Sequence, residues 1–137
     1  MYLLDTNIIS DVAKNPGGTA AARFASTEAG QLCTSIIVSA EVKYGLEKAR
    51  GHRLKSAMLA VLDAIEIVNL EKPADEIYAS LRAEMAQKGK AITPNDMFIA
   101  AHAMAIGATM VTDDEGFRQV PGLTVENWLR DVPAVRE

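Results

Sequence analysis

The chain alternates short apolar runs with longer stretches in which apolar residues recur every three or four positions. The short runs predict strands and the periodic stretches predict amphipathic helices. We expect strands at Tyr2–Leu4, Gln31–Thr34, Ile65–Leu70, Thr109–Thr112 and, with the weakest pattern, Leu123–Glu126. We expect helices at Ile8–Lys14, Ala20–Glu28, Ile36–Arg50, Arg53–Ala64, Ala74–Lys88 and Asn95–Ile106. This alternation predicts an α/β fold, with a mostly parallel sheet of four to five strands flanked by helices.

Capping and breaking residues agree with several of these boundaries. Ser35 precedes the helix that contains Glu41, and Thr93 precedes Pro94 at the start of a later helix. A Ser or Thr side chain accepts a hydrogen bond from the first turn of a helix, and Pro favours the first helical position. Gly107 follows the later helix and is suited to end it.

Length and composition indicate one globular domain. Of 137 residues, 49% are hydrophobic and 23% are charged, which is ordinary for a protein with its own core. No apolar stretch approaches the roughly 20 residues of a membrane span. The apolar start, Met1–Leu4, has no preceding basic segment of the kind found in signal peptides. We therefore expect a single domain over residues 1–137, no membrane association and a cytoplasmic location.

The few cysteine and histidine residues and the net charge narrow the chemistry. Cys33 is the single cysteine and lies in an apolar run, so we expect a buried thiol and no internal disulfide. His52 and His102 form no zinc-binding pattern with it, and the surroundings of His102 predict a core position. The net charge of −4 argues against a protein that coats nucleic acid by charge alone. A basic group remains, either a solvated helix face or a nucleic-acid contact: Lys43, Lys48, Arg50, His52, Arg53 and Lys55.

Four acidic residues stand where an α/β fold brings side chains together. Asp5 and Asp114 follow predicted strands, and ligands of open α/β sheets bind beyond the carboxyl ends of strands. Asp96 lies in the first turn of a helix, and Glu41 lies on the apolar side of another. Converging carboxylates repel one another, and a divalent cation held by carboxylates and water relieves the repulsion. The sequence thus predicts a metal site at these four acids.

Each acid also has a purely structural explanation. Asp5 and Asp96 are suited to stabilise the helices that they begin, and one of Asp113 and Asp114 fits a surface loop. Glu41 is the hardest to explain in this way, because its neighbours at three and four positions are uncharged. Of the adjacent pair we expect Asp114 to face the site, with Asp113 as the alternative.

Four motifs, in order along the chain, resemble the PIN-domain family and, more closely, the VapC-type toxins of bacterial toxin–antitoxin pairs. The resemblance extends from Leu3 to about Leu129. The motifs are Leu4–Ile8, Ser39–Gly45, Pro94–Ala103 and Val111–Asp114, followed by the similar ending Phe117–Leu123.

The resemblance implies a metal-dependent endoribonuclease whose acidic quartet binds Mg²⁺ or Mn²⁺. Asp5, Glu41 and Asp96 match the firmest positions of the family, and Asp114 matches the fourth, where some such toxins carry Asn. Asp5 and Asp96 are then the expected direct ligands. A metal-activated water would attack the RNA phosphodiester, and Lys43 with nearby basic groups would hold RNA phosphates.

The resemblance also implies partners. Such toxins are held inactive by a small antitoxin that commonly inserts a basic side chain into the acidic groove, and they form homodimers or toxin–antitoxin hetero-oligomers. Their substrates include transfer RNA. From the residues themselves, we expect Thr6 and Thr112 to support the site by hydrogen bonding.

Two other classes of protein fit these residues less well: phosphoryl-transfer domains of the haloacid or receiver type, and PIN-like modules without activity. A haloacid-type phosphoryl-transfer domain needs two aspartates separated by one residue after the first strand, whereas this chain has Asp5–Asn7 with Asn at the second position. A receiver domain would lack the glutamate at position 41. The remaining alternative is a catalytically silent PIN-like module that binds RNA or protein, and the presence of all four acids argues against it.

Overall fold

The computed structural model describes residues 1–131, in which five parallel strands form one sheet. The strands are β1 (Tyr2–Leu4), β2 (Leu32–Ser35), β3 (Glu66–Val68), β4 (Thr109–Val111) and β5 (Val125–Glu126). They lie in the order β3-β2-β1-β4-β5, and every neighbouring pair is parallel. The predicted α/β class and parallel sheet are confirmed, and the sheet has the larger of the two expected strand numbers.

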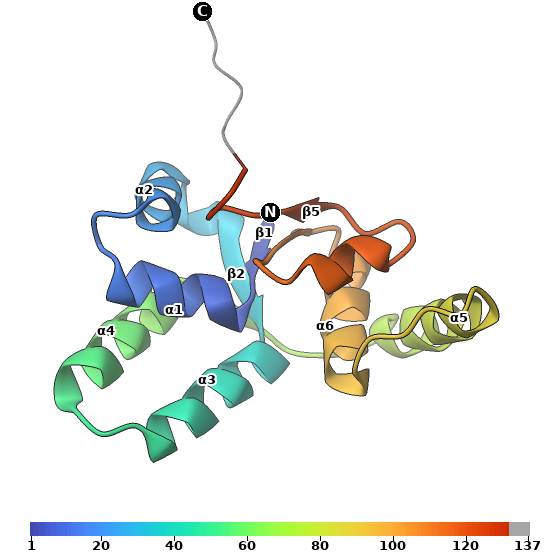
Figure 1. Cartoon of the computed structure of the whole chain (residues 1–137), viewed down its shortest axis with the longest axis horizontal. Coiled ribbons are helices and arrows are strands. Elements are labelled where there is room, and N and C mark those ends of the chain that lie inside the picture. Colours follow the sequence, from blue (N-terminus) through green and yellow to red (C-terminus); the bar gives the residue numbers. More distant parts are fainter. Residues whose placement is uncertain (132–137) are drawn as a thin grey trace, which may run out of the picture.

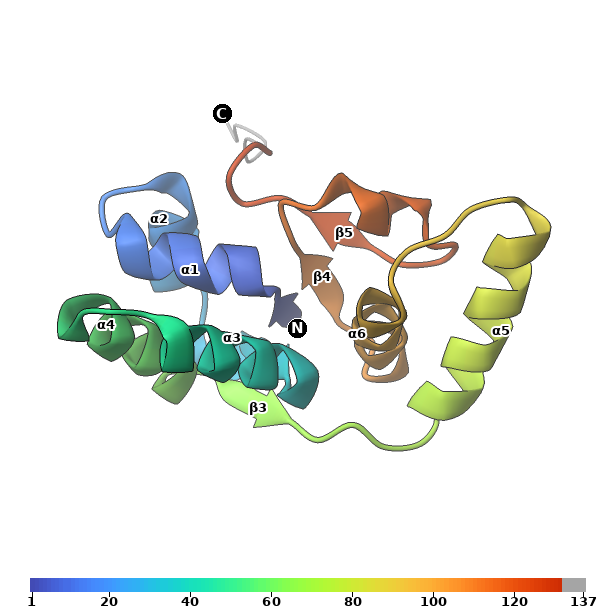
Figure 2. The same cartoon turned by 60° about the horizontal axis from the view of Figure 1, so that its bottom comes forward.

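Helices cover both sides of this sheet. They are α1 (Thr6–Lys14), α2 (Thr19–Ser26), α3 (Ile36–Lys48), α4 (His52–Asp63), α5 (Ala74–Gln87) and α6 (Pro94–Ala105), with 3₁₀ turns η1 (Ala29–Gln31) and η2 (Glu115–Gln119). Helices α1 to α4 gather on one side of the sheet, and α5 and α6 lie on the other (Figures 1 and 2). Every predicted element is present, with boundaries that differ by up to two residues.

The core lies at the central strands. Leu3 and Leu4 of β1 and Met110 and Val111 of β4 are fully buried, as expected for parallel strands that are covered on both faces. Cys33 of β2 is also fully buried, and burial raises the pKa of its thiol to about 11. The prediction of a buried thiol is therefore confirmed.

The strand order creates a switch point between β1 and β4. The chain begins in the central strand β1, adds β2 and β3 on one side, and then crosses over to place β4 on the other side of β1. At this reversal the connections leave the two strands toward opposite faces, which opens a crevice beyond their carboxyl ends. Asp5 follows β1 directly, and Thr112 follows β4.

The segment after β5 is anchored by Trp128. Its side chain is 1% exposed, and its ring meets Tyr2 edge-on with centroids 5.5 Å apart. The Arg23 guanidinium lies 5.1 Å from the centre of the Trp128 ring, within the range of a cation–π contact. In the part of the chain that the structure describes, no helix has the length and apolar character needed to span a membrane.

Candidate active site

Asp5 is fixed at the end of β1 by hydrogen bonds from both sides of the switch point. Its Oδ1 accepts a hydrogen bond from the Thr6 backbone N–H at 2.8 Å, which caps α1 and explains why the helix begins two residues earlier than its apolar periodicity suggests. Its Oδ2 accepts from the Thr112 hydroxyl at 2.7 Å and from the Asn7 amide at 3.3 Å. The carboxylate is 6% exposed. Asp5 therefore caps a helix and also faces the candidate site, and the expected hydrogen bond from Thr112 is present.

The loop after β4 holds Asp114 at the rim of the site. The Asp114 backbone N–H donates to the Thr112 hydroxyl at 3.0 Å, so one threonine contacts both Asp5 and this loop. The Asp114 Oδ1 accepts from the Gly116 backbone N–H at 2.8 Å and starts the 3₁₀ turn η2. Asp114 is exposed, and its second carboxylate oxygen has no hydrogen bond among residues 1–131.

Asp113 is held by other side chains. Its carboxylate accepts hydrogen bonds from the Asn127 amide at 2.8 Å and the Arg130 guanidinium at 3.1 Å. These contacts lower the pKa of the Asp113 carboxyl. An acid that is already paired with an arginine is poorly suited to receive a cation.

Glu41 and Asp96 reach the same region from two helices. Thr93 caps α6 by accepting the Asp96 backbone N–H at 3.2 Å, so Asp96 stands in the first turn, as predicted. Glu41 lies in the second turn of α3, whose N-cap is Ser35. It is half-buried, and its Oε1 is buried with no hydrogen-bond partner in the structure. A buried carboxylate oxygen without a donor costs stability.

Neighbouring negative charges raise the pKa values of Asp5, Glu41 and Asp96. Burial raises the pKa of Asp5, and the charges of Asp96 and Asp114 raise it further, although its hydrogen bonds from threonine oppose the shift. Burial also raises the pKa of Glu41, with contributions from Asp5 and Asp96. The pKa of Asp96 is raised by burial and by Asp114, against the effect of Thr93. Within residues 1–131, no lysine or arginine forms an ion pair with any of the four.

The donor set fits a hydrated oxygen-seeking cation better than a tightly chelated one. Among residues 1–131, no three His, Cys, Asp or Glu side chains lie close enough together to hold an ion directly. Mg²⁺ usually retains several waters and takes one or two carboxylates from the protein, which such a spacing accommodates. The unpartnered Oε1 of Glu41 and Oγ1 of Thr6 are buried atoms that a cation or its waters would satisfy.

Comparison with known proteins decides the family. Residues 2–123 match the family described as PIN domain. The chain belongs to the PIN-domain family. It is 34% identical to Ribonuclease VapC2 of Rickettsia felis over 131 residues, covering 93% of this chain and 98% of the relative. It is 32% identical to the tRNA(fMet)-specific endonuclease VapC of Shigella flexneri, covering 93% of this chain and 97% of the relative.

A solved structure agrees with this placement. The crystal structure of VapBC2 from Rickettsia felis, bound to a DNA fragment from their promoter, superposes with a TM-score of 0.84 at 33% identity. The match covers 93% of this chain and 98% of the other. The PIN domain described above therefore falls within the VapC group, and the resemblance carried by the four sequence motifs is confirmed.

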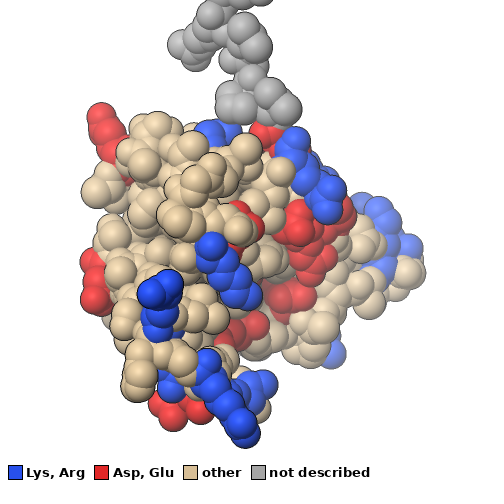
Figure 3. All heavy atoms as spheres, turned by 60° about the vertical axis from the view of Figure 1, so that its left-hand side comes forward, with Lys and Arg blue, Asp and Glu red and all other residues tan. Residues whose placement is uncertain are grey.

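Acidic and basic residues occur together on one face of this PIN domain. Figure 3 shows acidic atoms running through the middle of one face, with Lys and Arg atoms on both sides of them. Lys43 lines a hollow with Glu47 and Lys55, a different hollow from those that Glu41 lines. Lys14 instead shares a hollow with Glu41. Lys43 lies two residues after Glu41 and so on another face of α3. Its predicted contact with RNA phosphates therefore stays a prediction.

Sequence reasoning missed Lys14, although a signal for it exists. Thr6, Ser10 and Lys14 recur every four residues along α1, which places them on one face of the helix. All three line the hollow that also contains Glu41. In retrospect, this spacing, starting next to Asp5, would have indicated a polar stripe that leads away from the acids.

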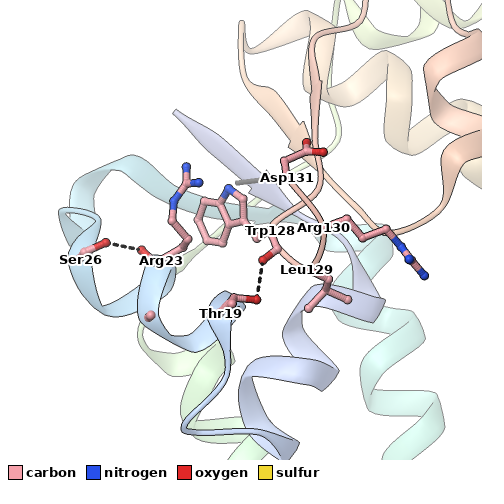
Figure 4. Close-up of a pocket in the computed structure, with 8 residues that line it drawn as sticks. Thr19, Arg23, Ser26, Trp128, Leu129, Arg130 and Asp131 are labelled. Atoms are coloured by element: carbon pink, nitrogen blue, oxygen red, sulfur yellow. Dashed lines mark hydrogen bonds between the residues drawn. The ribbon is translucent and has the colours of Figure 1, made fainter. Parts of the chain in front are cut away.

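A second cavity of this PIN domain is separate from the acids. It has a volume of about 430 Å³ and lies between α2 and the segment after β5. In Figure 4 the Trp128 ring lies between Arg23 and Leu129, and the Thr19 hydroxyl donates to the Trp128 carbonyl at 3.1 Å. The four acids do not line this cavity. This cavity is therefore not part of the candidate site at the switch point.

Proposed function

We propose that the protein is the toxin of a VapBC-type toxin–antitoxin pair and acts as a Mg²⁺- or Mn²⁺-dependent endoribonuclease. The observation that carries this proposal is the approach of Asp5, Glu41, Asp96 and Asp114 at the switch point without a cationic side chain paired to them within residues 1–131. The names of the VapC relatives support RNA as the substrate.

In this proposal Asp5 and Asp96 are direct ligands of the ion, and Glu41 and Asp114 complete the site directly or through water. A bound divalent ion would polarise the phosphodiester and lower the pKa of a bound water. Thr112 and Asn7 hold the Asp5 carboxylate in one orientation. The unpartnered Oε1 of Glu41 would be available to accept a hydrogen bond from the attacking water, and the raised pKa of Glu41 would suit it to receive the proton.

The proposed partners follow from the same acids. An antitoxin side chain with a positive charge would neutralise the carboxylates and block access to RNA. The name of the Shigella flexneri relative, a tRNA(fMet)-specific endonuclease, makes transfer RNA the first substrate to test. A homodimer, or a hetero-oligomer with the antitoxin, remains part of the proposal.

The test is cleavage of total small RNA by purified, antitoxin-free protein in Mg²⁺ or Mn²⁺, with a chelator control. Asp96→Asn should lower the rate at least 100-fold, in line with the loss of a group that acts on the transition state. Asp63→Asn is the matched control, because Asp63 is an exposed acid at the end of α4. Cleavage that survives Asp96→Asn would refute the assigned site. A folded protein that binds RNA but never cuts it would instead be a silent PIN-like module, which the wide spacing of the acids also allows.

A second pair of variants decides which of two adjacent acids belongs to the site. Asp114→Ala should reduce cleavage strongly, because it removes both the charge that acts on Asp5 and Asp96 and the side-chain oxygens. Asp113→Ala should retain most activity, because Asp113 is engaged by Asn127 and Arg130 and not by the site. The reverse ranking would assign the site to Asp113.

A further inference from the structure

An open hollow between α3 and α6 borders the acidic site. It has a volume of about 540 Å³ and is lined by Ile36, Ile37, Ala40, Glu41, Tyr44 and Asn95. Glu41 is one of the four acids, and Asn95 precedes another in the chain. A molecule seated in this hollow therefore lies next to the carboxylates. Hollows of this size are typical of sites for small organic groups.

The walls of this hollow combine an aromatic ring with aliphatic side chains that face solvent. Tyr44 is 65% exposed and Ile36 is 44% exposed, both unusually open for large apolar residues. Single exposed apolar residues are common on protein surfaces. These two instead share a hollow with an acid of the proposed site.

The Tyr44 ring differs from other tyrosine rings of the chain in having no aromatic neighbour. Tyr78 stacks on Phe98 with centroids 4.0 Å apart, and Tyr2 contacts Trp128. Among residues 1–131 the recorded ring contact of Tyr44 is with the Lys48 ammonium, which lies 4.5 Å from the ring centroid. The Lys48 ammonium thus lies over one face of this largely exposed ring, and no aromatic side chain among residues 1–131 stacks on the other face.

Charge favours a nucleobase over other parts of an RNA as the occupant. The acids repel phosphates, and the chain carries a net charge of −4, so attraction by total charge cannot hold the substrate here. A base is uncharged and stacks on aromatic side chains without regard to its identity. Lys48 can meet the phosphate attached to that base, and the Asn95 amide can meet its polar edge.

We propose that this hollow binds an unpaired nucleobase beside the scissile phosphodiester, with Tyr44 as its stacking platform. The inference rests on the proposed ribonuclease function and adds a requirement that the substrate be single-stranded at the cut. A base within a duplex is stacked on its neighbours and is not free to enter.

The test measures RNA binding separately from cleavage. A fluorescently labelled, unstructured RNA oligonucleotide is titrated with full-length protein in chelator, and the same strand annealed to its complement serves as the duplex probe. Tyr44→Leu should raise the Kd for the single strand about tenfold, since the stacking of one base is lost. Tyr44→Phe, which keeps the ring, should bind as the wild type does. Leu59→Ala is the matched control, because Leu59 is 41% exposed and lies on α4 in a different hollow.

Cleavage kinetics and the oligomeric state of Tyr44→Leu distinguish base stacking from other roles of the hollow. In Mg²⁺, Tyr44→Leu should raise KM about tenfold with little change in kcat, whereas damage to the acids would lower kcat. An unchanged single-strand Kd in Tyr44→Leu would overturn the proposal. A shift of Tyr44→Leu to a smaller species in sedimentation, with RNA binding unchanged, would also overturn it and assign the hollow to a second copy of the chain. Absence of cleavage by the wild type would refute the ribonuclease function, and the binding titration would still report on Tyr44.

Discussion

At the scale of single residues, the site is a set of acids whose mutual repulsion the fold tolerates. Asp5 is buried and accepts three hydrogen bonds, so its charge is partly compensated. Glu41 has a buried oxygen with no donor, so its charge is poorly compensated. Sites that sacrifice stability in this way are commonly functional. A substitution of Glu41 should therefore show most directly how much the acidic residues lower the free energy of unfolding.

Glu41→Gln should stabilise the protein in chelator at neutral pH. Burial and neighbouring acids raise the folded-state pKa of Glu41 above its unfolded value, so the folded state binds the proton more tightly. Stability of the wild type should therefore fall as pH rises from about 4 through the raised pKa, and the variant should lose this part of the slope. We expect a gain of up to about 1 kcal/mol, discounted for partial exposure, or a few degrees in Tm. Thermal melts from pH 4 to pH 8 measure it, with Glu47→Gln as the exposed control on the same helix.

Sequence alone does not decide whether Asp113 or Asp114 faces the candidate site. Adjacent side chains in a loop diverge, and the sequence favours one only through the motif around Thr112. The fold adds the reason, because Asn127 and Arg130, distant in sequence, hold Asp113. No local pattern predicts those two contacts.

At the scale of elements, the sequence predicted helices and their caps well because both are local properties. Ser35 and Thr93 accept the capping hydrogen bonds expected of them, and Gly107 has a φ of 67° after α6. The periodicity of α3 also separates its faces. Lys43 and Glu47 share a hollow that Glu41 does not line, as the helical spacing of these residues indicates.

Thr93→Ala should weaken both α6 and the site. The Thr93 hydroxyl accepts the Asp96 backbone N–H, and loss of such a cap costs about 1 kcal/mol. Because the capped residue is itself a proposed metal ligand, we also expect cleavage to slow and the Mg²⁺ concentration for half-maximal rate to rise. Thr93→Ser keeps the hydroxyl and should behave almost as the wild type. If Thr93→Ala lost this stability but kept the Mg²⁺ dependence of the wild type, the cap would have no part in the metal site.

At the scale of the whole molecule, the parallel class was predictable but the strand order was not. The five strands are short apolar runs, and nothing in them encodes which run pairs with which. The order β3-β2-β1-β4-β5 sets the switch point between β1 and β4, and hence the place of the site. The sequence predicts the four acids from their positions at element ends and on an apolar helix face. It does not predict that no three acidic, histidine or cysteine side chains among residues 1–131 lie close enough to hold an ion directly.

Mg²⁺ should raise the Tm of the whole protein. A ligand that binds the folded state at 100 times its Kd stabilises that state by about 2.7 kcal/mol. Relief of repulsion among the carboxylates is the physical source of this gain. Asp5→Asn with Asp96→Asn should abolish the increase, and KCl at matched ionic strength should not reproduce it. A wild-type Tm that is insensitive to Mg²⁺ and Mn²⁺ would argue against the proposed metal site.

The hydrogen bond between Asp5 and Thr112 has a consequence for the time at which activity first arises during synthesis. The two residues are separated by 107 positions, and β4 pairs with β1 only after the segment between them has been made. A chain still being translated, from which β4 is missing, carries Asp5, Glu41 and Asp96 but lacks the hydroxyl that orients the first of them. Because domains generally fold as units as they emerge, the growing polypeptide is expected to be inert. A partner that binds after the last strands have been synthesised, but before the site has assembled, therefore meets the chain before it is active.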